Sequence, residues 1–203
     1  MIGGIVKIME RRAEVNRKTK ETSIRIVLNL EGSGNTEISS GIPFFDHMMT
    51  LFSVHGFFDL IVDAKGDIDV DYHHTIEDVG LVLGDAFDRA LGDRKGIGRF
   101  GHAVTPMDDA LASVTVDLSN RPFLVYNVPA RASSEGLSFL PLTKEFLRAF
   151  SNRCGMNLHV NVFYGDNEHH INESIFKALG RALDQAVSFD DRVKDIRSSK
   201  GIL

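Results

Sequence analysis

Hydrophobic residues recur along this chain with two different periods, which predict two kinds of element. Alternation of apolar and polar positions with many β-branched residues is typical of a half-buried strand, and SIRIVLNL before the turn sequence EGSGN has this pattern. Apolar residues spaced three and four positions apart predict amphipathic helices. We therefore predict strands over residues 23–30, 57–64, 110–118, 123–128 and 157–163. Helices are expected over residues 43–54, 75–91, 142–150 and 171–187.

The two halves of the chain repeat the same order of features. When residues 73–91 are placed against residues 169–187, eight of the 19 positions are identical, and both segments begin with HHxxE. Shared Ala and Leu at helical spacing explain about four of these matches. They do not explain a second HHxxE, so the pattern indicates a duplication.

A strand-helix-strand-helix order that occurs twice predicts an α/β fold of the α+β sandwich type. We expect two tandem pseudo-symmetric repeats that form one compact unit, with the helices packed between β-sheets. Residues 11–96 form the first half and residues 97–192 the second, and RKGIGRFG joins them without a linker. Residues 1–10 are assigned to an N-terminal extension and residues 193–203 to a C-terminal tail.

Composition and charge narrow the functional classes. The 203 residues are 43% hydrophobic and 25% charged, as in an ordinary globular protein. A net charge of −5 argues against a general nucleic-acid binder, and no apolar run approaches the roughly 18 residues that a membrane helix needs. The single Cys154 excludes a disulfide framework and a cysteine-rich zinc site. We expect a cytoplasmic protein with neither nucleic-acid nor membrane partners.

Eight histidines, including two adjacent pairs, exceed what core packing requires. His73 and Glu77 are four positions apart at the start of a helix, so their side chains project from one face and can bind a single ion. His74 lies about 100° away around the helix. Adjacent histidines therefore suit two different metal ions. The second copy has the same arrangement, in His169, His170 and Glu173.

The duplication also predicts how the two ligand sets are completed. Each ion takes a histidine and the glutamate from one motif, and the second histidine from the other motif. His47, which lies 26 residues before His73, adds a ligand to the site of His73 and Glu77, and its counterpart in the second half is Glu145. Imidazole with carboxylate fits Mn, Fe, Co or Zn, and excludes a thiolate site or a carbonyl-lined calcium site.

The remaining candidates are polar residues whose roles the pattern leaves open. His55 before a glycine is either a pocket residue or a helix C-cap, whereas His102 and His159 have the surroundings of structural histidines. Five residues have the side chains that bind phosphate, although each alone is typical of a solvated surface: Arg99, Arg121, Lys177, Ser199 and Lys200. The tail sequence RSSKG is either disordered or a binding loop.

Seven motifs identify a resemblance: RxTKET, FFDHM, HG, DYHHTIED, PMDDAL, HHINESIFKALGRAL and SSKG. Together they resemble the imidazoleglycerol-phosphate dehydratase family from about Arg12 to the C-terminus. The resemblance implies a hydro-lyase of histidine biosynthesis that converts imidazoleglycerol phosphate to imidazole acetol phosphate. It also implies two Mn(II) ions per active site, and a homo-oligomer of 24 subunits that share their sites.

Carried over position by position, the resemblance implies a role for each candidate residue. One metal is expected on His47, His73, Glu77 and His170, and the other on His74, Glu145, His169 and Glu173. Glu21 resembles the catalytic acid/base of the family, and His55 a substrate-binding residue. The phosphate clamp corresponds to Arg99, Arg121, Lys177 and the tail residues Ser199 and Lys200. Many members have His at the position of Glu145, and an acidic residue at the position of Tyr72.

The implied chemistry explains why two metal ions are useful. A C–H beside an alcohol is a weak acid and hydroxide is a poor leaving group, but an imidazole whose nitrogens both bind metal is stabilised as an imidazolate and can expel the hydroxyl. Glu21 would move the protons. Two other functions fit the same ligands, a two-metal hydrolase with a bridging water and a non-enzymatic metal-storage shell. The storage shell leaves Glu21 and the cationic tail unexplained.

Overall fold

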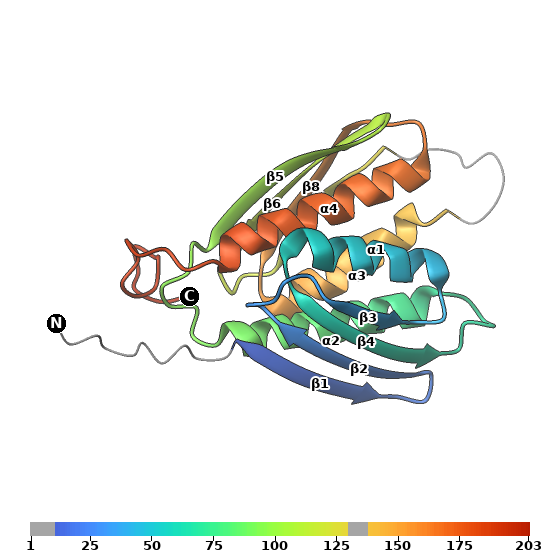
Figure 1. Ribbon diagram of the computed structural model, residues 1–203, viewed down its shortest axis with the longest axis horizontal. Coiled ribbons are helices and arrows are strands. Elements are labelled where there is room, and N and C mark those ends of the chain that lie inside the picture. Colours follow the sequence, from blue (N-terminus) through green and yellow to red (C-terminus); the bar gives the residue numbers. More distant parts are fainter. Residues whose placement is uncertain (1–10, 130–137) are drawn as a thin grey trace.

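Within the part of the chain that the structure describes, two four-stranded sheets enclose four helices (Figure 1). The structure is a computed structural model that describes residues 11–129 and 138–203. The first sheet has the order β1-β2-β4-β3, from β1 (Arg12–Lys18), β2 (Thr22–Asn29), β3 (Thr36–Ser39) and β4 (Asp59–Gly66). The second has the order β5-β6-β8-β7, from β5 (Phe100–Met107), β6 (Ala110–Asp117), β7 (Phe123–Asn127) and β8 (Asn157–Tyr164). The helices are α1 (Pro43–Gly56), α2 (His73–Leu91), α3 (Leu140–Cys154) and α4 (Glu168–Val187).

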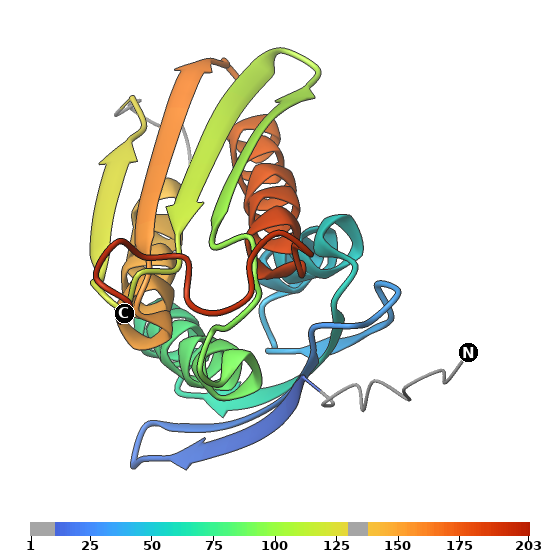
Figure 2. The ribbon, with the colours of Figure 1, turned by 90° about the vertical axis from the view of Figure 1, so that its left-hand side faces the viewer.

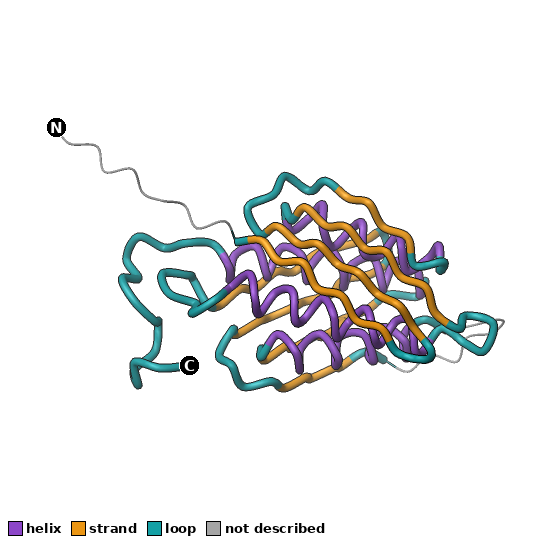
Figure 3. The backbone as a smooth tube through the Cα atoms, turned by 90° about the horizontal axis from the view of Figure 1, so that it is seen from below, coloured by secondary structure: helices purple, strands orange, loops and turns teal. Residues whose placement is uncertain are grey.

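The two sheets are built in the same way. In each, the first three strands in spatial order pair antiparallel, and the short fourth strand pairs parallel with its neighbour. Helix α2 packs on β1 and β2, as α4 packs on β5 and β6, and the two layers meet where α2 contacts α3 and α1 contacts α4. Figure 3 shows the strands of a sheet crossing obliquely over the helices. The predicted sandwich of two tandem repeats with helices between the sheets is therefore confirmed. The domain boundaries stay a prediction, and residues 1–10 lie outside the described residues.

Three strands were absent from the sequence prediction, namely β1, β3 and β5. All three are edge strands, which proteins commonly protect from further pairing by charged residues, short length or proline. Strand β1 (RAEVNRK) buries only two side chains, β3 has four residues, and β5 (FGHAVTPM) contains both Gly and Pro. Their patterns are too weak for an assignment from periodicity.

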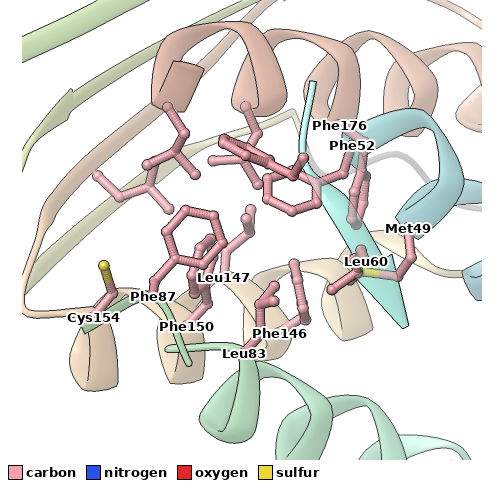
Figure 4. Packing of buried hydrophobic residues seen from close by; sticks show 14 of the residues in the cluster. Met49, Phe52, Leu60, Leu83, Phe87, Phe146, Leu147, Phe150, Cys154 and Phe176 are labelled. Atoms are coloured by element: carbon pink, nitrogen blue, oxygen red, sulfur yellow. The ribbon is translucent and has the colours of Figure 1, made fainter. Parts of the chain in front are cut away.

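The core lies between the helices and the two sheets, and Phe side chains fill its centre (Figure 4). The ring of Phe87 lies 5.2 Å from the rings of both Phe58 and Phe150. Two glycines, Gly84 and Gly180, allow the helices to approach closely, because a Cβ atom at either would lie under 3 Å from backbone atoms of the facing helix. None of the described helices is long and apolar enough to cross a membrane.

Candidate metal centre

Three side chains converge where α1 packs on α4. His47 comes from α1, and His169 and Glu173 come from the first turns of α4. The Nε2 atoms of His47 and His169 lie 3.3 Å and 2.9 Å from the same oxygen, Glu173 Oε1. Within residues 11–129 and 138–203, this is the one group of three such side chains whose ligand atoms all lie within 4.8 Å of one another. Two imidazoles and a carboxylate are donors that suit Mn, Fe, Co or Zn.

Both adjacent histidine pairs lie in the first turn of a helix, earlier than the apolar spacing predicts. Helix α4 begins at Glu168 because the side chain of Asn167 caps it by accepting the backbone N–H of His169. At the start of α2, the N-cap residue Tyr72 makes no side-chain capping bond, but the carboxylate of the residue before it, Asp71, accepts the backbone N–H of His73. These polar contacts extend each helix to include its HHxxE motif.

Glu173 is buried, and the polar groups around it keep its carboxylate ionised. Lys177 Nζ donates to Glu173 Oε2 at 2.6 Å, and it also contacts Met107 Sδ at 3.1 Å. Burial raises the pKa of Glu173, but the hydrogen bonds from Lys177 and His47 outweigh burial and lower the pKa to about 2. Glu173 is therefore ionised, as a metal ligand must be.

The corresponding residues of the first half are more loosely arranged. His73 Nε2 lies 3.5 Å from Glu77 Oε2, so these two side chains share a helix face as predicted. Glu145 on α3 forms an ion pair with Arg148 one turn later. Within one chain His47 therefore groups with His169 and Glu173, which belong to the other predicted ligand set. The two sets remain a prediction.

The second histidine of each pair contacts an aspartate that the sequence did not single out. His74 Nδ1 lies 3.1 Å from Asp67 Oδ2, and His170 Nδ1 lies 2.5 Å from Asp109 Oδ1. The hydrogen bond to Asp67 raises the pKa of His74, and the hydrogen bond from His170 lowers the pKa of Asp109. Asp109 lies in the quoted motif PMDDAL and Asp67 in a GD turn, but neither sequence feature reveals the contact.

Glu21 stands in the turn between β1 and β2, close to the first histidine pair. Its carboxylate lies 4.0 Å from His74 Nδ1, and its side chain is 58% exposed. Its backbone N–H donates to Thr19 Oγ1, which orders the turn. The carboxylate is thus held near a predicted metal ligand while it faces solvent.

A separate cleft of about 270 Å³ gathers four of the five predicted phosphate-binding residues. It is lined by Arg99, Arg121, Ser199 and Lys200, together with Ser119 and Ser198, which sequence reasoning missed. Arg99 binds Asp117 through Nε at 2.6 Å and Nη2 at 3.0 Å, and its Nη1 donates to the carbonyl of Arg197 in the tail. Figure 2 shows the tail passing across the end of the second sheet. That these residues bind phosphate stays a prediction.

Comparison with known proteins decides the family. The family model for imidazoleglycerol-phosphate dehydratase matches residues 40–183. The chain is 58% identical over 195 residues to imidazoleglycerol-phosphate dehydratase of Desulfosudis oleivorans, which covers 96% of this chain and all of that protein. The enzyme of Syntrophobacter fumaroxidans is 59% identical over 193 residues, 95% of this chain and 98% of that one. The chain belongs to the imidazoleglycerol-phosphate dehydratase family.

Solved structures of imidazoleglycerol-phosphate dehydratases have the same fold. The enzyme from Pyrococcus furiosus superposes with a TM-score of 0.80 at 37% identity, over 93% of this chain and 100% of that one. The enzyme from Staphylococcus aureus superposes with a TM-score of 0.78 at 33% identity, over 88% and 99%. Membership of this dehydratase family identifies the chain as a hydro-lyase and gives no support to the hydrolase or the storage shell.

Two residues expected near the substrate of a dehydratase lie outside the phosphate cleft. The ammonium group of Lys177 donates its hydrogen bond to Glu173, as described above. His55 lines another cleft with Arg181 and Asp184. Burial lowers the pKa of His55, with further contributions from the positive charges of Lys177 and Arg181. In one chain, neither His55 nor Lys177 completes the cleft around Arg99.

The cleft around Arg99 and the group of His47, His169 and Glu173 lie at opposite ends of α4. The backbone N–H of Arg99 donates to the carbonyl of Ala186, in the last turn of that helix. Ala186 follows His169 by 17 residues, which corresponds to about 25 Å along a helix axis. A small imidazole phosphate cannot bridge this distance within one chain of the family.

Proposed function

We propose that this chain catalyses the metal-dependent dehydration of imidazoleglycerol phosphate to imidazole acetol phosphate. It would carry out this step of histidine biosynthesis in the cytoplasm. The observation that carries the proposal is the group of His47, His169 and Glu173, because it presents metal ligands in a chain of the dehydratase family. Sequence identity of 58% over 195 residues supports the same substrate as the relative from Desulfosudis oleivorans.

The donor set is consistent with two Mn(II) ions per active site. His73 and Glu77 repeat the i,i+4 arrangement of His169 and Glu173, so each half offers one carboxylate and imidazoles to a hard divalent ion. The proposed ligand sets remain those of the duplication: His47, His73, Glu77 and His170 for one ion, and His74, Glu145, His169 and Glu173 for the other. When bound, the ions would polarise the substrate's imidazole ring and lower its pKa, which assists loss of the hydroxyl.

The active site is proposed to form between copies of this chain. The cleft around Arg99 would bind the phosphate, but it lies about 25 Å along α4 from His169 and Glu173 of the same chain. A neighbouring copy that brings its cleft to this cluster would complete the site. The two proposed ligand sets also contain residues that do not lie with His47, His169 and Glu173 in one chain, and a neighbouring copy would supply them. We therefore infer a homo-oligomer, and 24 subunits is the number that the family resemblance implies.

The chain's own residues would divide the remaining work between anchoring the substrate and moving protons. Arg99 and Arg121 present guanidinium groups, and Lys200 an ammonium group, in the cleft that would hold the phosphate. The exposed carboxylate of Glu21 would take the proton from the carbon adjacent to the carbinol carbon, whose hydroxyl leaves as water, and would give a proton to the former carbinol carbon as the enol becomes the ketone. Its carboxylate lies 4.0 Å from the proposed ligand His74, and Glu21 itself belongs to neither proposed ligand set.

The proposal is tested with purified protein, metal-free and then loaded with Mn(II). Imidazoleglycerol phosphate is added, and formation of the ketone is followed alongside release of inorganic phosphate, which a hydrolase would produce. We expect ketone without free phosphate, only in the loaded sample. Equal ketone formation without metal would contradict metal dependence, and no ketone in either sample would contradict the function itself.

A further inference from the structure

We propose that Asp109 is a positioning residue that fixes His170 as a metal ligand through Nε2, and that it is the counterpart in the second repeat of Glu21 in the first. The inference rests on the proposed metal-dependent function, which it deepens by assigning a role to a residue outside the ligand sets.

The correspondence of Asp109 with Glu21 follows from the repeated topology. Glu21 immediately precedes β2, and Asp109 immediately precedes β6. Strand β2 pairs antiparallel with β1 and β4, and β6 pairs antiparallel with β5 and β8 in the same way. Both carboxylates therefore end a hairpin turn at the same position of their sheets. Each also faces Nδ1 of the second histidine in its own half, Glu21 at 4.0 Å from His74 and Asp109 at 2.5 Å from His170.

Unlike Glu21, Asp109 is held in place on both of its oxygens. Oδ1 contacts His170 Nδ1, and Oδ2 accepts the backbone N–H groups of Asp166 and Asn167, at the start of α4. A carboxylate with these three partners has one orientation. It also ties the β5–β6 turn to the first turn of the helix that carries the second HHxxE motif.

This contact determines which nitrogen of His170 is free. An ionised carboxylate only accepts hydrogen bonds, so the proton of a neutral imidazole must be on Nδ1. Nε2 then has the lone pair that a metal ion requires. The nearest carboxylate to Nε2 is that of Asp108, at 3.6 Å, which is beyond hydrogen-bond distance and belongs to a side chain that is 71% exposed.

In the first half, a different residue has taken over this role. Asp67, from the loop between β4 and α2, approaches His74 Nδ1 to 3.1 Å, closer than Glu21. Because Asp67 orients His74, the ring does not depend on Glu21, whose carboxylate lies 4.0 Å from Nδ1 and stays free to exchange protons. The duplication thus has two hairpin carboxylates at one position, of which one is locked for orientation and the other is available for catalysis.

The test measures metal binding without substrate. Metal-free full-length protein is titrated with Co(II), whose visible bands report the ligand geometry, in competition with a chromophoric chelator. Asp109→Ala should weaken Co(II) binding about 10- to 100-fold, the usual effect of removing a carboxylate behind a histidine ligand. Asp109→Asn should lose less, because its amide oxygen still accepts from Nδ1–H. Asp108→Asn is the matched control and should bind like wild type.

A double-mutant cycle separates orientation from a general effect on the fold. In a His170→Ala background, Asp109→Ala should cost nothing further, because the residue acts through that ring. An equal loss in both backgrounds would overturn the inference. If Asp109→Ala does not fold, Asp109→Asn carries the test: its single amide oxygen can accept from His170 Nδ1 or from the backbone N–H groups of Asp166 and Asn167, but not from both, so Co(II) binding should weaken, and wild-type affinity would overturn the inference.

Histidine tautomers give a readout that a merely structural role would not change. Two-bond ¹⁵N–¹H spectra of the metal-free protein should show His170 protonated on Nδ1, and Asp109→Ala should abolish that preference. Wild-type Co(II) affinity in Asp109→Ala, with dehydration intact, would overturn this inference alone. Failure of the loaded wild type to dehydrate the substrate, with the expected order of Co(II) affinities, would overturn the proposed function alone.

Discussion

The imidazole rings of His169 and His170 lie 6.2 Å apart, with an angle of 84° between their planes. The other adjacent pair, His73 and His74, repeats this geometry at 6.2 Å and 85°. Successive residues of a helix point about 100° apart, so the two rings of a pair face different directions. Each HHxxE motif can therefore contribute to two ions, and the repeat reproduces the arrangement to within a degree.

Glu145 is predicted to bind metal because it occupies the position of His47 in the second repeat. We expect Glu145→Ala to lose one metal equivalent, and Glu145→His to keep most of the activity, since imidazole can replace the carboxylate as a ligand. Elemental analysis of the purified variants measures this. Arg148→Gln is the matched control: it removes the ion pair with Glu145 but keeps the carboxylate, so its metal content should be that of wild type. Full metal content in Glu145→Ala would refute the assignment.

The close approach of the helices predicts that Gly180→Ala and Gly84→Ala are destabilising. A Cβ atom at Gly180 would lie 2.4 Å from the carbonyl oxygen of Phe52, and one at Gly84 would lie 2.8 Å from that of Phe150. Backbone cannot move aside as a flexible side chain can, so each substitution should cost about 1–3 kcal/mol in the free energy of unfolding. Denaturant titration of the metal-free protein measures the cost. Arg181→Ala, on the exposed side of the same helix, should change it by less than about 0.5 kcal/mol.

The sequence predicts the parts of the fold that depend on local periodicity. All four helices and the strands β2, β4, β6, β7 and β8 lie within a few residues of their expected ranges. The pairing of His73 with Glu77 was predictable too, because helix geometry alone sets the separation of residues four apart. The repeat then predicts the second copy.

The contacts made by loops could not be predicted in this way. Asp109 lies 61 residues from His170 in sequence, and only the packing of the β5–β6 turn on α4 brings them together. The separation of Arg99 from His169 along α4 is likewise a property of the tertiary structure. Candidates chosen by residue type alone could not reveal that one chain divides its proposed active site between two ends.

Removal of metal should dissociate the assembly. If the ligand sets draw on neighbouring subunits, an ion joins two chains, and its loss removes that connection. We expect a chelator to convert the oligomer into smaller species and Mn(II) to restore it, as measured by light scattering. Scattering that is unchanged after complete removal of the metal would contradict the shared site.

The depressed pKa of His55 predicts a pH dependence of stability. Burial and the charges of Lys177 and Arg181 lower the pKa of this ring in the folded protein, so the unfolded chain takes up a proton at higher pH than the folded chain does. The contribution of His55 to stability is complete above the unfolded value near 6.5 and is lost as the pH falls below it. Denaturation of metal-free His55→Gln at pH 8 and pH 6 should show a smaller loss than wild type. An identical loss in both proteins would contradict the assignment.

His74 acts in the opposite direction, which is why the variant comparison is needed. The hydrogen bond to Asp67 raises the pKa of His74, so its contribution is present at low pH and is lost as the pH rises through the folded value. Asp67→Asn should reduce that opposing contribution while leaving the effect of His55 in place.

Glu21 is the residue on which the proposed proton transfer depends. Its carboxylate faces solvent beside His74, whereas its counterpart Asp109 is locked by three hydrogen bonds. If Glu21 moves protons, Glu21→Gln should lower kcat by about 10²- to 10⁴-fold, the usual contribution of general acid/base catalysis. Metal content and substrate affinity should stay nearly intact, because Glu21 belongs to neither proposed ligand set.

The same measurement separates proton transfer from substrate binding. If Glu21 only holds the substrate, KM should rise while kcat stays near that of wild type. Lys20→Gln, in the same turn, is the control: it removes a charge beside Glu21 without touching the carboxylate, and its kcat should be close to wild type. Steady-state kinetics on imidazoleglycerol phosphate with saturating Mn(II) decide between the two roles. A kcat for Glu21→Gln similar to that of the Lys20→Gln control would mean that another group moves the proton.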